Sequence, residues 1–386
     1  MNRQTKKIII VGAGFAGLTA ARKLAKSKLG LEITLFDKKE NSEFLPMLPD
    51  CIGRAIEPAV LSYRIADFCA KLKISFIRQE VKSIDLQAKR LIAEKADYNY
   101  DFLLIASGSQ TNFFSNKNAA ENAIGLNSIR DVEQLISVLK NNESDNFIVS
   151  GGGYTGIEAA THLGVYFKKR KLDKKIIIVE KSPRILGSLP DWMKEYTEKN
   201  LKSLGIEIFA DSVIEDIQKN KVKISQGRFF DKAAVVWVAG VRTADFIQQL
   251  QVQKNPQGRI ITDQYLRINP DAFCVGDAAF FGDKENSLRM AVQFSITEGS
   301  QASGNIIRSV KGAPLKKFKP VDLGFIVPMA NNRSCGIVFG VRIKGFIATV
   351  FHFIMCIYRS YGFKNKFGII GNLIKSAFNR QGGVRC

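Results

Sequence analysis

Three glycines near the N-terminus have the spacing of a turn that can hold a phosphate chain. Gly12, Gly14 and Gly17 follow the β-branched run of residues 7–11 and precede apolar residues at helical spacing, a pattern that predicts a strand, a tight turn and a helix. The missing Cβ atoms let the backbone turn and approach a pyrophosphate, and the helix N-terminus adds free N–H groups. Asp37 ends the next apolar run, where it can accept hydrogen bonds from ribose hydroxyls. We therefore predict a bound dinucleotide at this turn.

The same arrangement occurs a second time along the chain. Gly151, Gly153 and Gly156 follow another short apolar run, and Glu180 ends the apolar run that comes next. Two such signals are far more specific than one. Because a carboxylate binds a free 2′-hydroxyl and repels a 2′-phosphate, Glu180 favours NADH over NADPH. The sequence therefore predicts two dinucleotide sites.

Two further strand ends carry residues that suit a ligand. Ser107 and Gly108 end a buried apolar run, and Gly276 and Asp277 follow another. Small residues at these positions let the backbone contact a bound molecule. Asp277 either binds a ribityl or ribose hydroxyl or caps the helix that follows.

A loop with two prolines follows the first dinucleotide motif. Pro46 and Pro49 stand among large apolar residues in the stretch 44–49, which therefore cannot be a central strand. We expect this loop to pack against something flat and apolar. A flavin ring and the ordinary core beneath a loop both fit that description.

Length, charge and cysteine spacing limit the class of protein. A chain of 386 residues suits two or three domains, and its formal net charge of +21 predicts an anionic partner such as nucleic acid, a membrane surface or an acidic protein. The six cysteines form no close pair, so we expect reduced thiols with neither a disulfide framework nor a zinc site. His162 and His352 are the only histidines and lie far apart in sequence, and we predict no metal site. The N-terminal apolar run is too short for a secretory signal or a spanning helix.

The C-terminal region is basic and apolar at once. From Leu323 to Cys386 there is no Asp or Glu, against nine Lys and Arg. The uncharged run 345–358 is too short to span a bilayer, and the apolar residues of 363–378 recur at the spacing of an amphipathic helix. Such a helix lies in a membrane interface, although it can also dock on its own domain or on a dimer partner. Nucleic acid is the less favoured partner, because the basic residues are interleaved with large aliphatics.

Taken together, these motifs resemble the two-dinucleotide-binding-domain flavoproteins, and most of all the type II NADH:quinone oxidoreductases. The resemblance covers nearly the whole chain, including the stretch from Val321 onward. It rests on the two glycine turns and on residues 44–48, 106–114, 238–242 and 275–277. It implies an α/β fold with two Rossmann-like dinucleotide-binding domains, one for FAD and one for NADH, plus a C-terminal amphipathic helical membrane-binding region.

The resemblance also implies where the domains and the cofactor contacts lie. The FAD-binding domain is expected in two parts, residues 1–113 and 260–306, around an NADH-binding domain of residues 114–259, with a membrane-associating region at 307–386. The FAD contacts that it implies are Gly12, Gly14, Phe15, Ala16, Gly17, Asp37, Lys38, Pro46, Val81, Ala106, Ser107, Gly108, Gly276 and Asp277. The NADH contacts are Gly151, Gly153, Tyr154, Thr155, Gly156, Glu180 and Gly240.

Three catalytic residues follow from the same resemblance. Glu158 is expected near the nicotinamide and the flavin, and Gln293 and Thr297 at the quinone site. In this family a helix beside the flavin usually carries two glutamines four residues apart. Gln293 matches the first, but Thr297 stands where the second is usual, so a shorter polar group would reach the acceptor from the same helix face.

These features predict a peripheral enzyme on the cytoplasmic side of the cell membrane that passes two electrons from NADH through FAD to a membrane quinone. A homodimer is expected, with an anionic membrane surface as a further partner and no nucleic acid. One alternative is a sulfide:quinone oxidoreductase, which needs a pair of cysteines at the flavin that this sequence does not evidently supply. The others are a soluble NADH-dependent reductase of an electron-carrier protein and a non-enzymatic flavin- and NADH-sensing protein that binds nucleic acid or partners.

Overall fold

The computed structural model describes residues 5–283 and 287–378 of the chain. These residues form two compact units whose segments alternate along the sequence. The first unit comprises residues 1–42, 63–110 and 242–322, and the second comprises 43–62, 111–241 and 323–386. The expected boundaries at 113, 259 and 306 concern cofactor binding and stay predictions. Four short strands stand where the chain passes between the units: β3 (Asn41–Glu43), β4 (Ser62–Arg64), β10 (Gln110–Thr111) and β18 (Val241–Arg242).

The first unit is built on a six-stranded sheet. Its order is β20-β21-β9-β1-β2-β5, parallel except for the edge strand β20, and β1 is an inner strand whose apolar residues 8–11 are buried. The strands are β1 (Lys7–Val11), β2 (Glu32–Asp37), β5 (Ser75–Arg78), β9 (Phe102–Ile105), β20 (Arg267–Asn269) and β21 (Ala272–Cys274). Its helices are α1 (Phe15–Ala25), α3 (Ile65–Leu72), α8 (Asp245–Gln249) and α9 (Val292–Val310).

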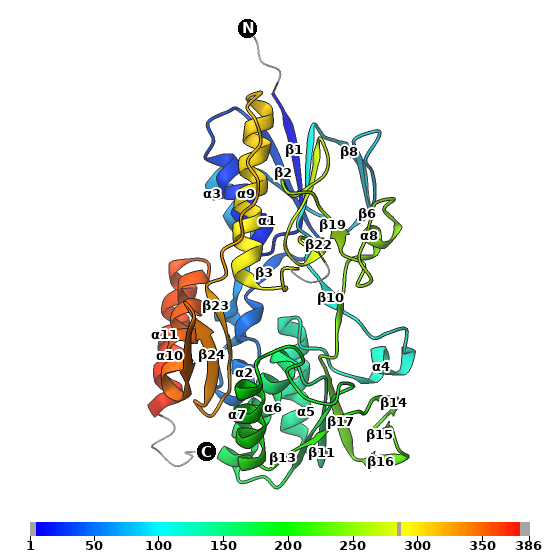
Figure 1. Cartoon of the computed structure of the whole chain (residues 1–386), viewed down its shortest axis with the longest axis vertical. Coiled ribbons are helices and arrows are strands. Elements are labelled where there is room, and N and C mark those ends of the chain that lie inside the picture. The colour runs from blue at the N-terminus through cyan, green and yellow to red at the C-terminus, as the bar shows by residue number, and fades with distance from the viewer. Residues whose placement is uncertain (1–4, 284–286, 379–386) are drawn as a thin grey trace. The chain divides into compact units, whose positions relative to one another are not determined.

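Helices α1 and α9 lie side by side in this unit (Figure 1). At Gly299 of α9 a Cβ atom would come within 2.3 Å of the carbonyl oxygen of Ala16 on α1. A glycine is therefore needed for the close approach of the two helices. The remaining elements of the unit are β6 (Val81–Asp85), β7 (Arg90–Ala93), β8 (Asp97–Asn99), β19 (Ile260–Ile261), the 3₁₀ turn η3 (Gly276–Ala278) and β22 (Ala279–Phe280).

The second unit repeats the parallel sheet on a smaller scale. Its order is β13-β12-β11-β17, with every pair parallel. The strands are β11 (Asn146–Ser150), β12 (Lys175–Val179), β13 (Ile206–Phe209) and β17 (Ala233–Trp237), and an antiparallel sheet holds β14 (Ile214–Gln218), β15 (Lys221–Ile224) and β16 (Arg228–Asp231). The helices are α2 (Asp50–Gly53), α4 (Lys117–Asn122), α5 (Ile129–Asn141), α6 (Tyr154–Arg170) and α7 (Asp191–Ser203), with 3₁₀ turns η1 (Leu45–Met47) and η2 (Pro58–Leu61). The predicted α/β fold with two Rossmann-like domains is confirmed.

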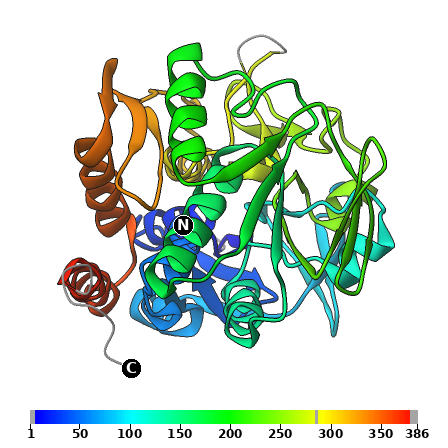
Figure 2. The same ribbon diagram turned by 90° about the horizontal axis from the view of Figure 1, so that it is seen from below.

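The C-terminal segment belongs to the second unit and ends in two helices. A three-stranded antiparallel sheet, β23 (Gly324–Val327), β24 (Ser334–Val338) and β25 (Val341–Lys344), leads into α10 (Gly345–Arg359), which packs on β24 and β25 (Figure 2). Helix α11 (Phe363–Phe378) follows, as the sequence spacing predicts. Two of the nine basic residues, Arg380 and Arg385, lie outside the described residues. None of the described helices has the length and apolar character needed to cross a membrane.

Both terminal helices expose large apolar side chains. Phe346 of α10 and Phe367 of α11 are 66% and 69% exposed. The exposed apolar residues of the two helices are Phe346, Ile347, Val350, Phe351, Ile354, Tyr358, Phe363, Phe367, Ile370, Ile374 and Phe378. Such a patch, without an acidic residue on either helix, marks an interaction surface.

Candidate active site

The two glycine turns have the same local geometry. Gly12 and Gly151 have φ of +104° and +108°, a region that residues with a side chain rarely adopt. A Cβ atom on Gly17 or Gly156 would lie 1.9 Å from the carbonyl oxygen of Gly12 or Gly151. These positions are therefore fixed by the packing of the turn itself rather than by a ligand.

The middle glycine of each turn differs, because its free side faces open space. A Cβ atom built on Gly14 or Gly153 meets no atom within 4 Å. Each of these glycines is the N-cap of the following helix, which has no side-chain cap and no acidic residue in its first turn. Uncapped helix N–H groups beside an open position fit a phosphate group. The residues present therefore fit the pyrophosphate of one dinucleotide in each unit.

The acid behind each turn holds the turn in place. Asp37 Oδ2 accepts a hydrogen bond from the N–H of Ala13 at 2.7 Å, and Asp37 Oδ1 accepts from Lys39. Glu180 Oε2 accepts in the same way from the N–H of Gly152 at 2.6 Å, and Glu180 Oε1 from Ser182. Burial raises the pKa of Asp37, and the two N–H donors oppose that change. The repeat thus extends to the hydrogen bonds of the carboxylates, whose remaining lone pairs can accept from ribose hydroxyls.

The end of β9 and the η3 turn bring further predicted FAD contacts into the first unit. Asp277 Oδ2 accepts a hydrogen bond from the hydroxyl of Ser109 at 2.8 Å, and burial raises the pKa of Asp277. The hydroxyl of Ser107 is buried without a hydrogen-bond partner among the described residues. A buried hydroxyl in that state fits a polar ligand at this strand end. Ser109 was not predicted as a site residue from the sequence, although it follows Gly108 directly.

A glutamate on α9 fixes the η3 turn. Glu298 Oε2 accepts a hydrogen bond from the N–H of Gly276 at 2.5 Å. Burial raises the pKa of Glu298 to about 8, partly offset by this N–H donor and by Arg259. The guanidinium of Arg259 also donates to the carbonyl of Asp277 at 3.0 Å. Glu298 and Arg259 therefore hold the backbone at Gly276 and Asp277 in place.

The two predicted quinone-site residues lie on α9. The amide of Gln293 donates to Asp322 Oδ1 at 2.9 Å, and Asp322 forms a two-pronged ion pair with Arg289. The hydroxyl of Thr297 donates back to the carbonyl of Gln293 at 3.0 Å. The orientation of the Gln293 amide is thus set by a carboxylate, whereas Thr297 offers its oxygen only as an acceptor.

The remaining predicted FAD contacts are divided between the units. Phe15, Ala16 and Gly17 open α1, Lys38 follows β2, Val81 opens β6 and Ala106 follows β9, all in the first unit. Pro46 lies in η1, which belongs to the second unit. The loop predicted at 44–49 is a 3₁₀ turn leading into α2. Contact of these residues with FAD stays a prediction.

The predicted NADH contacts lie together in the second unit. Tyr154 and Thr155 open α6, directly after Gly153. The carbonyl of Gly240 accepts the N–H of Asn112 at 3.0 Å, and a Cβ atom on Gly240 would lie 2.8 Å from the ring of Phe114. Gly240 therefore allows Phe114 to pack against the segment after β17.

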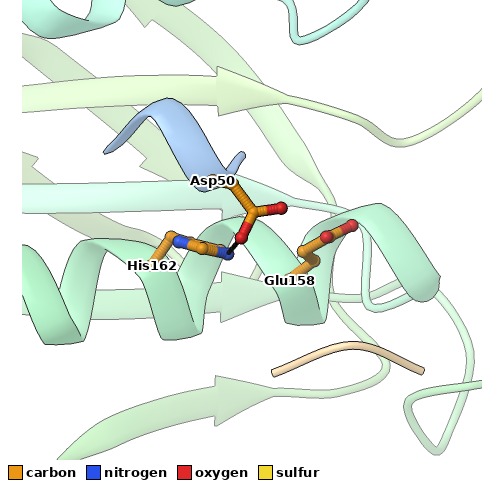
Figure 3. A group of neighbouring side chains, drawn as sticks. All are labelled: Asp50, Glu158 and His162. Carbon is orange, nitrogen blue, oxygen red and sulfur yellow. Dashed lines mark ion pairs between the residues drawn. The ribbon is translucent and has the colours of Figure 1, made fainter. Parts of the chain in front are cut away.

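Glu158 lies one turn into α6 within a buried polar cluster of the second unit. Its neighbours are His162, one turn further along α6, and Asp50 on α2 (Figure 3). The three side chains can each place one ligand atom within 4.8 Å of the others. Glu158 is 7% exposed and Asp50 1%. His162 Nε2 lies 3.6 Å from Asp50 Oδ1.

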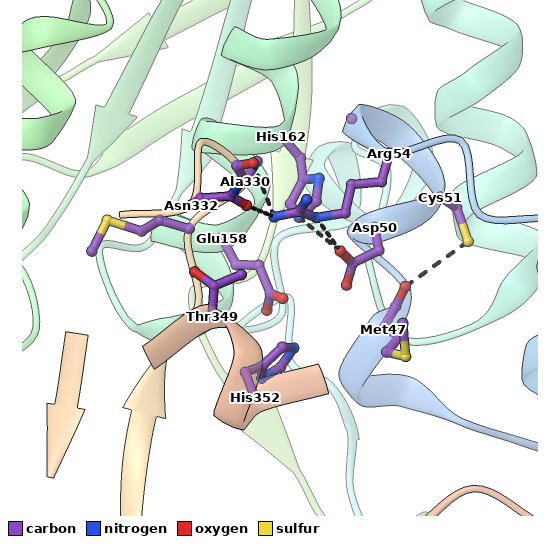
Figure 4. A network of polar contacts seen from close by, with 12 residues as sticks. Met47, Asp50, Cys51, Arg54, Glu158, His162, Ala330, Asn332, Thr349 and His352 are labelled. Atoms are coloured by element: carbon purple, nitrogen blue, oxygen red, sulfur yellow. Dashed lines mark hydrogen bonds and ion pairs between the residues drawn. The ribbon is translucent and has the colours of Figure 1, made fainter. Parts of the chain in front are cut away.

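Arg54 supplies the positive charge of this cluster. Its Nε lies 2.9 Å from Asp50 Oδ1, and its Nη2 donates to the carbonyl of Ala330 and to Asn332 Oδ1 (Figure 4). Burial raises the pKa of Asp50 to about 6, although Arg54 lowers it. Burial and the nearby Asp50 raise the pKa of Glu158 well above its usual range. Both effects therefore favour the protonated form of Glu158.

Sequence reasoning did not find the partners of Glu158. His162 and His352 are far apart in sequence, yet both lie at this cluster, where burial and the charge of Arg54 lower the pKa of His352 to about 4. The one available signal was the spacing of four residues in Glu158–His162 and in Asp50–Arg54, which places each pair on one helix face. Nothing in the sequence brings α2 and α6 together.

The cysteines agree with the expectation of reduced thiols. Cys51, Cys69, Cys274, Cys335 and Cys356 are free and buried, and Cys386 lies outside the described residues. Burial raises the pKa of the Cys335 thiol to about 11, and its sulfur lies 3.7 Å from the hydroxyl of Thr197. A buried thiol in this state is a poor nucleophile.

Comparisons with known proteins place the chain among flavin- and nicotinamide-dependent enzymes. A type II NADH:quinone oxidoreductase of Staphylococcus epidermidis is 29% identical over 373 residues, covering 89% of this chain and 92% of the relative. The structure of NDH2 from Plasmodium falciparum in complex with NADH is similar with a TM-score of 0.87 at 17% identity, covering 99% of this chain and 100% of that one. The structure of the sulfide:quinone oxidoreductase from Aquifex aeolicus is similar with a TM-score of 0.78 at 18% identity, covering 99% of this chain and 96% of that one.

The family match covers both glycine turns and the acids behind them. It extends over residues 6–302, which include β1 of the first unit, α6 of the second and the η3 turn with Asp277. This span is more than half of the chain. The protein therefore belongs to the pyridine nucleotide-disulphide oxidoreductase family.

Proposed function

We propose that this chain is an FAD-dependent NADH:quinone oxidoreductase. The observation that carries the proposal is that each compact unit contains an open, uncapped glycine turn backed by a carboxylate. Two such turns suit two dinucleotides, FAD as the resident redox group and NADH as the donor. The acceptor is assigned from the Staphylococcus epidermidis relative, whose name is type II NADH:quinone oxidoreductase.

When bound, FAD supplies the hydride and electron chemistry, and this chain's residues bind, orient and shield the reactants. The N–H groups at the start of α1 would hold the FAD pyrophosphate, and Asp37 the adenosine ribose. In the second unit, the start of α6 and Glu180 would hold NADH in the same manner. Asp277, fixed through Glu298 and Arg259, would bind a hydroxyl of the ribityl chain.

Glu158 and Gln293 are the polar groups we assign to the reaction. Formation of a quinol from NADH and a quinone consumes one proton besides the hydride. Glu158, whose pKa is raised by burial, can hold such a proton. Gln293, oriented by Asp322, would hydrogen-bond the acceptor, with the oxygen of Thr297 beside it. Glu158→Gln and Gln293→Ala should each slow quinone turnover, and unchanged turnover in both would contradict this assignment.

The exposed apolar faces of α10 and α11 are assigned to an anionic membrane surface. Their lack of acidic residues favours the cytoplasmic leaflet, where each Lys or Arg near the surface contributes about 1 kcal/mol. Phe351→Ser with Phe367→Ser should lower binding to vesicles that contain anionic lipid, measured by flotation. Phe229→Ser, an exposed aromatic outside these helices, is the control. The family resemblance is the ground for proposing a homodimer, which light scattering would test.

Stopped-flow reduction and reoxidation of the purified flavoprotein test the whole proposal. Under anaerobic conditions NADH should reduce the flavin faster than NADPH, and benzoquinone or naphthoquinone acceptors should reoxidise it. Flavin reduction by sulfide with quinone present would favour the sulfide:quinone alternative. Reoxidation only by a small electron-carrier protein would favour a soluble reductase. Failure to turn over any acceptor, together with salt-sensitive binding of nucleic acid, would favour the sensing protein.

A further inference from the structure

Two carboxylates of the second unit, Asp50 of α2 and Glu158 of α6, share one buried site (Figure 3). Each has an oxygen without a hydrogen-bond partner among the described residues, Asp50 Oδ2 and Glu158 Oε1. A buried carboxylate oxygen without a donor is costly. Two of them in one site indicate that something other than a protein N–H satisfies them.

Arg54 is the permanent positive charge beside this pair, and it balances one carboxylate anion. Arg54 faces Asp50 from the same helix, 2.9 Å away. From α10, His352 is neutral at physiological pH, because burial and Arg54 lower its pKa to about 4. Burial raises the pKa of the Cys51 and Cys356 thiols, so neither adds a charge. The charged group on α10 is Arg359, which lowers the pKa of His352 and of Cys356. His162, on α6, lies next to Asp50.

We infer that Asp50 and Glu158 together hold a single proton. Arg54 stabilises the carboxylate of Asp50, so the proton stays on Glu158. Asp50 is thereby the positioning residue that keeps Glu158 protonated. With one proton on the pair, the buried charges of Asp50 and Arg54 cancel. This is the state that a desolvated site favours. The two carboxyl groups then titrate as one coupled system.

A divalent cation is the other occupant that the three side chains could accept. It would require both carboxylates to be ionised, and with Arg54 it would leave a net positive charge inside the unit. Asp50 Oδ1 already faces the guanidinium at 2.9 Å, which a metal ion would have to tolerate. The proton therefore fits the charges of this cluster better than a metal ion.

The consequence for catalysis rests on the proposed function, whereas the sharing of the proton does not. Without the Asp50 charge, burial would still favour protonated Glu158, but Arg54 would oppose it without a carboxylate of opposite effect nearby, so the pKa of Glu158 would fall. Glu158 would then lose, at a lower pH than in the wild type, the proton that quinol formation consumes. Asp50 thus extends the pH range over which Glu158 can act as an acid.

Infrared spectroscopy of the purified full-length flavoprotein tests the shared proton directly. Protonated Glu298 also absorbs in the carboxylic acid region, so the signal is taken as wild type minus the isosteric Glu158→Gln variant. We expect one protonated carboxyl in this difference at pH 7. In an Asp50→Asn background the same difference should disappear at a lower pH than in the wild type and return on acidification. Glu57→Gln, which changes an exposed carboxylate after the same helix, should match the wild type.

Three results would overturn the inference. The first is the absence of a protonated carboxyl from the difference between wild type and Glu158→Gln. The second is a signal whose pH dependence Asp50→Asn leaves unchanged. The third is one equivalent of divalent metal in the purified protein that is lost in Asp50→Asn. The first needs only wild type and Glu158→Gln, so it stands even if Asp50→Asn does not fold.

The pH profile of quinone turnover is the second readout, which a merely structural role of Asp50 would not move. In Asp50→Asn the alkaline limb should shift to lower pH by at least about one unit, a tenfold change in proton concentration, with rates recovering at low pH. A flavin-loaded Asp50→Asn enzyme with an unshifted limb would contradict the inference. If the wild type shows the infrared signal but no quinone turnover, the proposed function fails and the acid pair stands.

Discussion

The open space beside Gly14 and Gly153 makes a sharp prediction for alanine at each position. Both glycines have φ near −80°, which alanine adopts without strain, and their Cβ atoms would meet nothing within 4 Å. Alanine is a poorer N-cap than glycine, but it also loses less chain entropy on folding. These effects oppose each other, so the free energy of unfolding should change by less than about 1 kcal/mol in Gly14→Ala and in Gly153→Ala.

Ligand binding should respond very differently from stability. A methyl group at Gly153 would stand where the backbone approaches the NADH pyrophosphate and would lengthen at least one charge-assisted hydrogen bond. Such a bond contributes about 1.5–3 kcal/mol, so NADH affinity should fall about 10- to 150-fold. The FAD content of Gly153→Ala should stay normal. Gly14→Ala should show the reverse, with weak FAD retention.

The assay pairs urea unfolding with two binding measurements on each variant. FAD content is read from the absorbance of the purified protein, and NADH affinity from the concentration dependence of anaerobic flavin reduction. Gly156→Ala serves as the contrast, because its Cβ atom would lie 1.9 Å from the carbonyl oxygen of Gly151 and should destabilise the fold itself. Normal NADH affinity in a stable Gly153→Ala protein would refute the assignment of this turn to NADH.

Two further predictions concern acidic groups of the first unit. Glu298→Gln should flatten the pH dependence of stability, because burial raises the folded-state pKa of Glu298 from 4.5 to about 8 and the wild type therefore loses up to about 5 kcal/mol of stability as pH rises between these values. Urea unfolding midpoints at pH 5 and pH 8 would show the difference, and parallel profiles of the two proteins would count against it. Asp322→Ala should raise the KM for quinone about 10-fold, because it releases the Gln293 amide. Flavin reduction by NADH should stay unchanged and is the internal control. An equal loss of rate in both half-reactions would contradict this role of Asp322.

The sequence predicts the local elements well because their signals are local. The strands before the glycine turns, the helices after them and the amphipathic helix at 363–378 all follow from spacing and from residue type, and the structure confirms them. The acids Asp37 and Glu180 are predictable for the same reason, since each ends a strand next to its own turn. Their bonds to the turn N–H groups are a further consequence of that neighbourhood.

The buried cluster around Glu158 was not predictable in this way. It needs α2, α6 and α10, whose residues 50, 158 and 352 have no mutual spacing rule. The few histidines suggested that neither one has a ligand role, and only tertiary packing shows that both belong to one cluster. Likewise, Asp322 is a surface-type residue by sequence, and its contact with Gln293 depends on how the chain returns after α9.

The contact between Gly299 and Ala16 has a consequence for the order in which this protein is made. Helix α1 leaves the ribosome early, but α9, which packs against it, is translated only after residues 43–62 and 111–241 of the other unit. Until then the side of α1 that faces α9 has no native cover, so we expect the nascent chain to depend on chaperones and to misfold when synthesis stalls before α9.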